Sequence, residues 1–262
     1  MKFDKKDYTF SDLIDIIYLL RSDNDCPWDR VQTHDSIKMN LVEESYEAIE
    51  ALDAGDKMKF ADELGDILLQ VVFHSVIGEE DKTFSVSDVI NLVCKKMISR
   101  HTHIFGDDKA ETPDEVLDTW DKNKLKEKGL KSHSEDLKGV CHYLPALIRA
   151  RKVQSKATKV GFDWNDVSGA LDKLTEEISE LKEAIDACDS VNISEELGDL
   201  LFSVVNVSRF LKVEPEEALT KSTEKFISRF EKLENLAKER GLSIENMSLE
   251  EMDKLWDEIK HK

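Results

Sequence analysis

The 262-residue chain has few of the residues that build sheets, disulfide frameworks or membrane spans. With only 10 glycines and 4 prolines, it offers few of the turn signals that separate short strands. Its cysteines lie far apart without a CxxC pair, which is typical of reduced thiols (Cys26, Cys94, Cys141 and Cys188). No apolar run is long enough to cross a bilayer, and the N-terminal MKFDKKDYTF lacks the apolar core of a secretory signal. Long amphipathic stretches dominate instead, so we expect an all-α protein in the cytoplasm.

Positive charge is also scarce. The chain has 37 Lys and Arg against 56 Asp and Glu, a net charge of −19, which argues against a nucleic-acid or anionic-membrane surface. A small polyphosphate is still compatible with this charge if a metal ion bridges it. The glycines form neither a Walker-type nor a dinucleotide-binding loop, and no HExxH motif occurs. His101 and His103 stand two apart without a third partner, so we assign them a structural or phosphate-neighbouring role.

An acidic motif that occurs twice is the most informative feature of the chain. EESYE begins at Glu43 and ELGD follows at Glu63; 133 positions downstream, EEISE begins at Glu176 and ELGD follows at Glu196. Residues three apart on a helix project from nearly the same face, so each motif supplies one close pair of carboxylates. The corresponding acids are Glu44, Glu47, Glu63 and Asp66 in the first half, and Glu177, Glu180, Glu196 and Asp199 in the second.

The residues around the acids predict a helical hairpin in each half. Apolar residues after each ELGD have the spacing of a stripe that packs against a core: Leu64, Ile67, Leu68, Val71 and Val72, then Leu197, Leu200, Leu201, Val204 and Val205. Residues 54–56, Ala-Gly-Asp, are typical of a turn between two helices. Antiparallel helices would then bring four carboxylates to one small volume.

Such a group of acids favours a metal site. Like charges within a few ångströms raise one another's pKa, and a divalent cation removes that cost. Oxygen ligands without Cys or His suit a hard ion such as Mg²⁺, with Mn²⁺ as a substitute. The alternative is an ordinary solvated helix face in a chain with 56 acidic residues. Two copies with the same spacing and the same apolar stripe favour the metal site.

The repeat extends to cationic and aromatic residues. KMISR at 96–100 recurs as KFISR at 225–229, and each places a Lys and an Arg one helical turn apart. A Trp followed four residues later by a Lys also occurs in both halves, and Trp28 has a partial echo in Trp164. Acids for metal, cations for phosphate and an aromatic for a base together compose a nucleotide polyphosphate site. These residues are Lys96, Arg100, Trp120 and Lys124, and Lys225, Arg229, Trp256 and Lys260.

A polar stretch, GLKSHSEDLKGV, separates the two halves and has a glycine near each end. We expect an N-terminal domain at residues 1–128, a linker at 129–140 and a C-terminal domain at 141–262. No low-complexity segment interrupts either half.

Nearly the whole chain resembles the MazG nucleoside triphosphate pyrophosphohydrolases in their tandem two-domain form. The resemblance rests on the two EExxE and ExxD pairs and on five flanking segments: CPWDRVQTH from Cys26, RHTHIFG from Arg100, VGFDW from Val160, and the KFISRF and LPALIRARKVQ stretches of the second half. It implies two all-α helical-bundle domains of the MazG type, a homodimer, and Mg²⁺-dependent hydrolysis of nucleoside triphosphates to a monophosphate and pyrophosphate. Nucleotide-pool house-cleaning is the cellular role that the family suggests.

The resemblance also implies roles for individual residues. Glu44 and Glu177 are expected to act as general bases as well as metal ligands, with the other six acids as ligands. Lys225, Arg229 and Lys260 match positions that grip the triphosphate, and Trp256 one that lines the base pocket. The internal repeat extends these roles to Lys96, Arg100, Lys124 and Trp120.

Two departures from the family pattern are visible, and two other functions stay open. Asn192 stands where a lysine can precede the second ExxD, and Thr102 stands where RHPH is more usual. The first departure leaves open which half carries the chemistry. A narrower pyrophosphatase for dUTP, dCTP or phosphoribosyl-ATP is the alternative enzyme. A non-catalytic metal-binding helical scaffold is the alternative outside enzymes, although it has no use for the recurring Lys, Arg and Trp.

Overall fold

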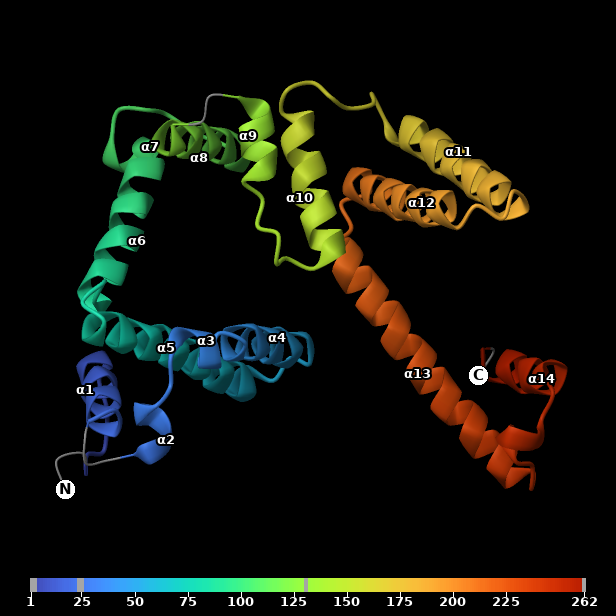
Figure 1. Cartoon of the computed structure of the whole chain (residues 1–262), viewed down its shortest axis with the longest axis horizontal. Coiled ribbons are helices and arrows are strands. Elements are labelled where there is room, and N and C mark those ends of the chain that lie inside the picture. The colour runs from blue at the N-terminus through green and yellow to red at the C-terminus, as the bar shows by residue number, and fades with distance from the viewer. Residues whose placement is uncertain (1–3, 23–25, 130–131, 261–262) are drawn as a thin grey trace. The chain divides into compact units, whose positions relative to one another are not determined.

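The computed structural model describes residues 4–22, 26–129 and 132–260. Helices and loops make up these residues, without a strand among them, so the all-α prediction is confirmed. The chain divides into two compact units, residues 1–127 and 128–262 (Figure 1). Residues 130–131 of the expected linker, and the terminal residues 1–3 and 261–262 of the expected domains, lie outside the described residues. No described helix is both long enough and apolar enough to cross a membrane.

Unit 1 is built around one helical hairpin, formed by α4 and α5. Its helices are α1 (Phe10–Leu20), α2 (Pro27–Arg30), α3 (His34–Ile37), α4 (Asn40–Asp53), α5 (Lys57–Glu80), α6 (Val86–Arg100), α7 (Thr102–Phe105) and α8 (Pro113–Lys128). Helices α4 and α5 run side by side, and α1 packs on α5 (Figure 1). The buried core of this unit lies between α1, α3 and α5.

The turn between α4 and α5 follows from its local sequence. Gly55 has φ +73°, a left-handed conformation that glycine adopts without steric cost, and it ends α4. The Asp56 side chain then accepts hydrogen bonds from the backbone N–H groups of Met58 and Lys59, at 3.1 and 3.0 Å, and so caps the start of α5. The expected turn therefore lies where the sequence places it.

Unit 2 contains the matching hairpin, formed by α11 and α12. Its helices are α9 (His133–Lys138), α10 (Ala146–Thr158), α11 (Val167–Asp186), α12 (Ser190–Phe210), α13 (Pro215–Glu239) and α14 (Leu249–Lys260), with a short 3₁₀ turn at Ile244–Asn246. Helix α10 packs on α12, and α14 folds back on α13 (Figure 1). Helix α9 forms within the polar stretch that separates the acidic motifs, and it packs on α10.

The second hairpin turn repeats the first with one change. Asp189 caps α12 by accepting from the backbone N–H groups of Val191 and Asn192, at 3.1 and 3.2 Å. Cys188, at φ +53°, occupies the left-handed position that Gly55 has in unit 1. All four cysteines are free, as expected.

Candidate functional site

Each hairpin brings three carboxylates together. In unit 1 one oxygen each of Glu44, Glu63 and Asp66 lie within 4.8 Å of one another. In unit 2 the same is true of Glu177, Glu196 and Asp199. One acid of each set comes from the first helix of the hairpin and two from the second, so the turn between the helices is what assembles the site.

The remaining predicted ligand of each half lies at the edge of its cluster. The charge of Glu47 is among the causes that raise the pKa values of Glu44 and Glu63, so it lies close to both. Burial, followed by the charges of Glu177 and Glu196, likewise raises the pKa of Glu180.

The clusters are destabilised by their own charge in the absence of a cation. Burial is the largest cause that raises the pKa values of Glu44, Glu63 and Glu196, and neighbouring carboxylates raise them further. Glu63 is 6% exposed and Glu177 is 4% exposed, so little water reaches either carboxylate. Buried, mutually repelling oxygens of this kind fit a hard divalent cation.

A lysine accompanies each cluster, but at different places. In unit 2 the Lys173 ammonium lies 2.8 Å from a carboxylate oxygen of Glu177, one helical turn away on α11. Its bonds to Glu176 and then Glu177 raise its pKa, which keeps it charged. The position 133 residues earlier is Asn40, at the start of α4. The sequence interpretation overlooked Lys173, although a lysine four residues before EExxE is visible in the second half alone.

The converse difference precedes the ExxD motifs. Lys59 of unit 1 lies 3.7 Å from Glu50, an exposed pair across the hairpin. Unit 2 has Asn192 at the matching position. The two units therefore present their lysine to the carboxylates from opposite helices.

The predicted cationic and aromatic residues of unit 1 lie on α6 and α8. The Arg100 guanidinium stands 5.2 Å from the centre of the Trp120 ring and pairs with Glu127 at 2.8 Å. Lys96 contributes to lowering the pKa of Glu127, after the hydrogen bonds from Arg100 and Ser99. Lys124 lies on α8, one helical turn after Trp120.

Their counterparts in unit 2 lie on α13 and α14. Trp256 packs on Phe226, with ring centres 5.3 Å apart, beside the buried cluster that includes Leu233. Lys260 pairs with Asp257 at 3.0 Å. Lys225 and Arg229 lie on α13, one helical turn apart. The structure thus groups these four residues with one another, while the carboxylates lie on α11 and α12.

A cavity of about 920 Å³ adjoins the carboxylates of unit 2. Glu177, Asp199 and Lys173 form part of its wall. Three aromatic rings, those of Phe162, Trp164 and Phe202, form another part, and residues of α9, α10 and α12 complete it. A concave, largely apolar space with a few polar groups is the usual form of a small-molecule site.

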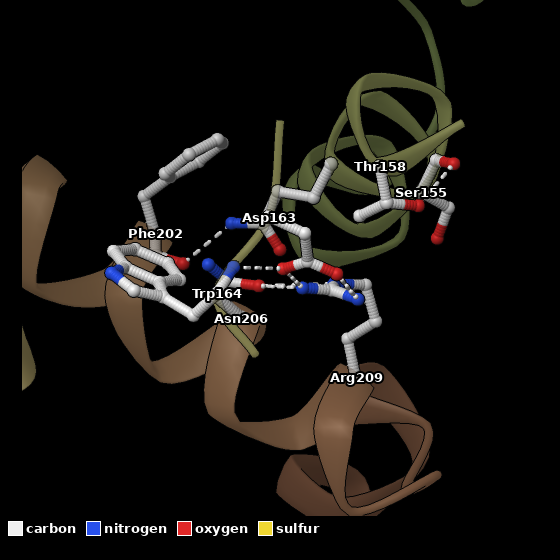
Figure 2. Close-up of polar contacts among 8 residues, drawn as sticks. Ser155, Thr158, Asp163, Trp164, Phe202, Asn206 and Arg209 are labelled. Atoms are coloured by element: carbon white, nitrogen blue, oxygen red, sulfur yellow. Dashed lines mark hydrogen bonds and ion pairs between the residues drawn. The ribbon is translucent and has the colours of Figure 1, made fainter. Parts of the chain in front are cut away.

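The loop after α10 is held against α12 by a polar network (Figure 2). The Arg209 guanidinium donates to both carboxylate oxygens of Asp163, at 2.9 and 2.5 Å, and to Asn206 Oδ1 at 3.0 Å. Asp163 also accepts from the backbone N–H of Trp164 at 2.9 Å. The network fixes the VGFDW segment beside the cavity. The sequence interpretation singled out this segment but not Asn206 or Arg209, which carry no local motif.

A helical hairpin with clustered carboxylates beside a ligand-sized cavity defines an acidic, metal-binding site of an all-α enzyme. The MazG nucleotide pyrophosphohydrolase domain family matches two segments of the chain, residues 32–105 and 166–234. The two segments contain both hairpins, so the duplication inferred from the motifs is confirmed.

Two curated relatives match over nearly their full length. The chain is 46% identical over 251 residues to the nucleoside triphosphate pyrophosphohydrolase/pyrophosphatase MazG of Thermotoga maritima, which covers 96% of this chain and 95% of that protein. It is 39% identical over 251 residues to the nucleoside triphosphate pyrophosphohydrolase of Escherichia coli K12, with 95% of each chain covered. The chain belongs to the MazG family and is an enzyme of the nucleotide pyrophosphohydrolase class.

Proposed function

We propose that the protein hydrolyses ribo- and deoxyribonucleoside triphosphates to the monophosphate and pyrophosphate, with Mg²⁺ as its metal and Mn²⁺ as a substitute. The convergence of three carboxylates within 4.8 Å in each hairpin is the observation that carries the proposal. In unit 2 these carboxylates border a cavity large enough for a nucleoside. The names of the two relatives agree with this activity.

The residues present fit a magnesium ion. All six clustered acids offer oxygen, and the raised pKa values of Glu44, Glu63 and Glu196 show that positive charge is needed there. Glu47 and Glu180 complete the proposed ligand sets. When bound, Mg²⁺ supplies positive charge to the phosphate oxygens and helps to activate water.

The proposed reaction is attack of water on the α-phosphorus. The new bond joins the water oxygen to the α-phosphorus, the bond from that phosphorus to the α,β-bridging oxygen breaks, and pyrophosphate leaves. Glu177, and Glu44 in unit 1, would take the proton of the water. The Lys173 ammonium, 2.8 Å from Glu177, holds that carboxylate in place and adds positive charge beside the phosphates.

The remaining predicted residues are proposed to bind substrate. Lys225, Arg229 and Lys260 would contact the triphosphate and Trp256 the base, with Lys96, Arg100, Lys124 and Trp120 in the same roles in unit 1. Because the unit 2 set lies on α13 and α14 while the carboxylates lie on α11 and α12, a second copy of the chain is the simplest source of the missing half of each site.

A homodimer is therefore part of the proposal. Large apolar side chains are exposed along α6 and α13, including Leu92 at 64%, Phe226 at 56% and Ile227 at 53%. An exposed apolar face of this extent is typical of a surface that pairs with another chain. Sedimentation of the whole protein should give twice the chain mass, and Phe226→Lys should shift it towards one chain mass.

Nucleotide-pool house-cleaning is the proposed cellular role, and broad base tolerance would support it. A restricted enzyme for dUTP, dCTP or phosphoribosyl-ATP is the competing outcome of the same measurement.

The test is hydrolysis of a panel of ribo- and deoxyribonucleoside triphosphates in ¹⁸O-labelled water with Mg²⁺, followed by mass analysis of both products. Label in the monophosphate establishes attack at the α-phosphorus. Label in pyrophosphate, release of inorganic phosphate, or no turnover of any nucleotide would each contradict the proposal. Phosphoribosyl-ATP belongs in the panel because its selective hydrolysis would identify the narrower enzyme.

A further inference from the structure

Gln154 of α10 is a buried amide with an unused acceptor. Its side chain belongs to a residue that is 6% exposed, and its Nε2 donates to the backbone oxygen of Phe202 at 2.8 Å. Its Oε1 is buried and has no hydrogen-bond partner among the described residues. Because a backbone carbonyl can only accept, the bond to Phe202 fixes which end of the amide is the nitrogen. The oxygen is therefore an acceptor without a donor.

This unused acceptor belongs to the wall of the cavity that reaches Glu177 and Asp199. A buried acceptor without a donor is unfavourable, and a ligand that brings an N–H removes the penalty. The nearby charges do not supply that donor, since the Arg209 guanidinium is engaged by Asp163 and Asn206 (Figure 2).

The rest of the cavity suits a flat aromatic ligand. The Trp164 ring packs directly on α11 at Gly169, where an added Cβ would lie 2.3 Å from Trp164 Cδ1. Phe162 and Phe202 line the same space. Ring faces stack on aromatic bases whatever their identity, so these walls bind a base and the single amide reads its edge.

We propose that this cavity is the nucleobase subsite of unit 2, and that the Gln154 side-chain oxygen accepts a hydrogen bond from an N–H of the base. The inference rests on the proposed function, because the phosphates would extend from this subsite to Glu177 and Asp199. Adenine and cytosine offer an exocyclic amino group, and guanine, uracil and thymine offer a ring N–H. One acceptor therefore admits all five bases but discriminates against a base that has no such donor.

The test compares ATP with purine riboside triphosphate, which has the same ring but lacks the 6-amino group. For the wild-type protein with Mg²⁺, kcat/KM should be about five- to tenfold higher for ATP, the effect of one hydrogen bond to an otherwise unpaired acceptor. In Gln154→Met, which keeps the length of the side chain, the preference should fall to within about twofold. Gln70→Met is the matched control, a buried glutamine of unit 1 that is 7% exposed and should keep the wild-type preference.

Equal kcat/KM values for the two nucleotides in the wild-type protein would overturn the inference, and this comparison needs no variant to fold. An unchanged preference in Gln154→Met, or an equal loss of preference in Gln70→Met, would overturn it as well.

Calorimetric dissociation constants for AMP and purine riboside monophosphate separate this inference from the function on which it rests. Neither compound has a phosphoanhydride bond, so both can be measured whether or not the protein hydrolyses triphosphates. Absence of all turnover would contradict the proposed function alone, while equal dissociation constants for the two monophosphates would contradict the role of Gln154.

Discussion

The two units have the same acidic hairpin but treat the helix face beside it differently. In unit 1, Phe73 and Val76 of α5 are buried in an apolar core with Ile17 of α1. The positions 133 residues downstream on α12 are Asn206 and Arg209, and both line the cavity. One pair of substitutions thus separates a filled core from a ligand-sized space.

The side chains of α1 also reinforce the filled state of unit 1. Arg21, at its C-terminal end, is 8% exposed and lies over the Phe73 ring, 5.2 Å from its centre. It donates to the backbone oxygen of Asp29 at 2.6 Å and pairs with Glu80 at 2.6 Å. These contacts occupy the space beside the hairpin, so a duplicated metal site does not by itself duplicate a nucleotide site.

The largest expected effect tests which unit carries the reaction. Glu177→Gln removes a metal ligand and the proposed base beside the cavity, and it should lower kcat/KM for the best nucleotide by about 100-fold or more. Glu44→Gln should leave kcat/KM within about threefold, because its cluster borders a packed core. Steady-state kinetics of both variants decide this, and equal losses would show that the difference between the units does not matter for turnover.

Lys173 provides the next effect, since it has no lysine counterpart in the first hairpin. Lys173→Met should lower kcat/KM about tenfold, because a charge-assisted contact to Glu177 and a cation near the phosphates are lost together. Lys59→Met in unit 1 is the matched control and should change kcat/KM by less than about twofold. Kinetics at several Mg²⁺ concentrations would reveal a trivial cause, which is a loss that excess metal fully restores.

Metal removal should affect both units, because both hairpins cluster three acids. A Mg²⁺ concentration about 100-fold above its Kd should raise the Tm by about 5 °C relative to EDTA. Glu63→Gln and Glu196→Gln should each remove part of that response, and the double variant should show none. A full response in the double variant would mean that the ion binds elsewhere.

The smallest effect is the pH dependence of the metal-free protein. Burial raises the pKa values of Glu63 and Glu196 above their ordinary value, so each carboxyl group stabilises the fold while protonated. That contribution is lost as the pH rises through the raised folded-state pKa. In EDTA, Glu63→Gln and Glu196→Gln should therefore raise the Tm at pH 7.5 and do so less at pH 5. Glu63→Gln should give the larger gain, because Glu63 is buried and Glu196 is half-buried. Thermal scans at both pH values check the sign, and a gain that grows at pH 5 would contradict it.

Several features of the site could be predicted from local sequence because they depend on helix geometry alone. The spacing of EExxE and ExxD sets which acids share a helix face, and the turn residues with Asp56 and Asp189 as caps set where the helices reverse. The family also followed from these motifs and their flanking segments. Lys173 could have been found the same way, as a lysine one turn before Glu177.

The cavity could not be predicted in that way. Gln154, Asn206 and Arg209 come from α10 and α12, and nothing in their local sequence announces a site. Their role depends on which helix packs against which, and on whether the facing side chains fill the space between them.

The sequence by itself therefore determined the all-α fold, the duplication, the two acidic clusters and the family, because helical periodicity and short turns act over a few residues. Only the tertiary structure decided that unit 2 has a cavity beside its carboxylates, while Phe73 and Arg21 fill the corresponding place in unit 1. Packing is a property of side chains that meet from distant segments, and its outcome turns on volume and pairing that no local pattern records.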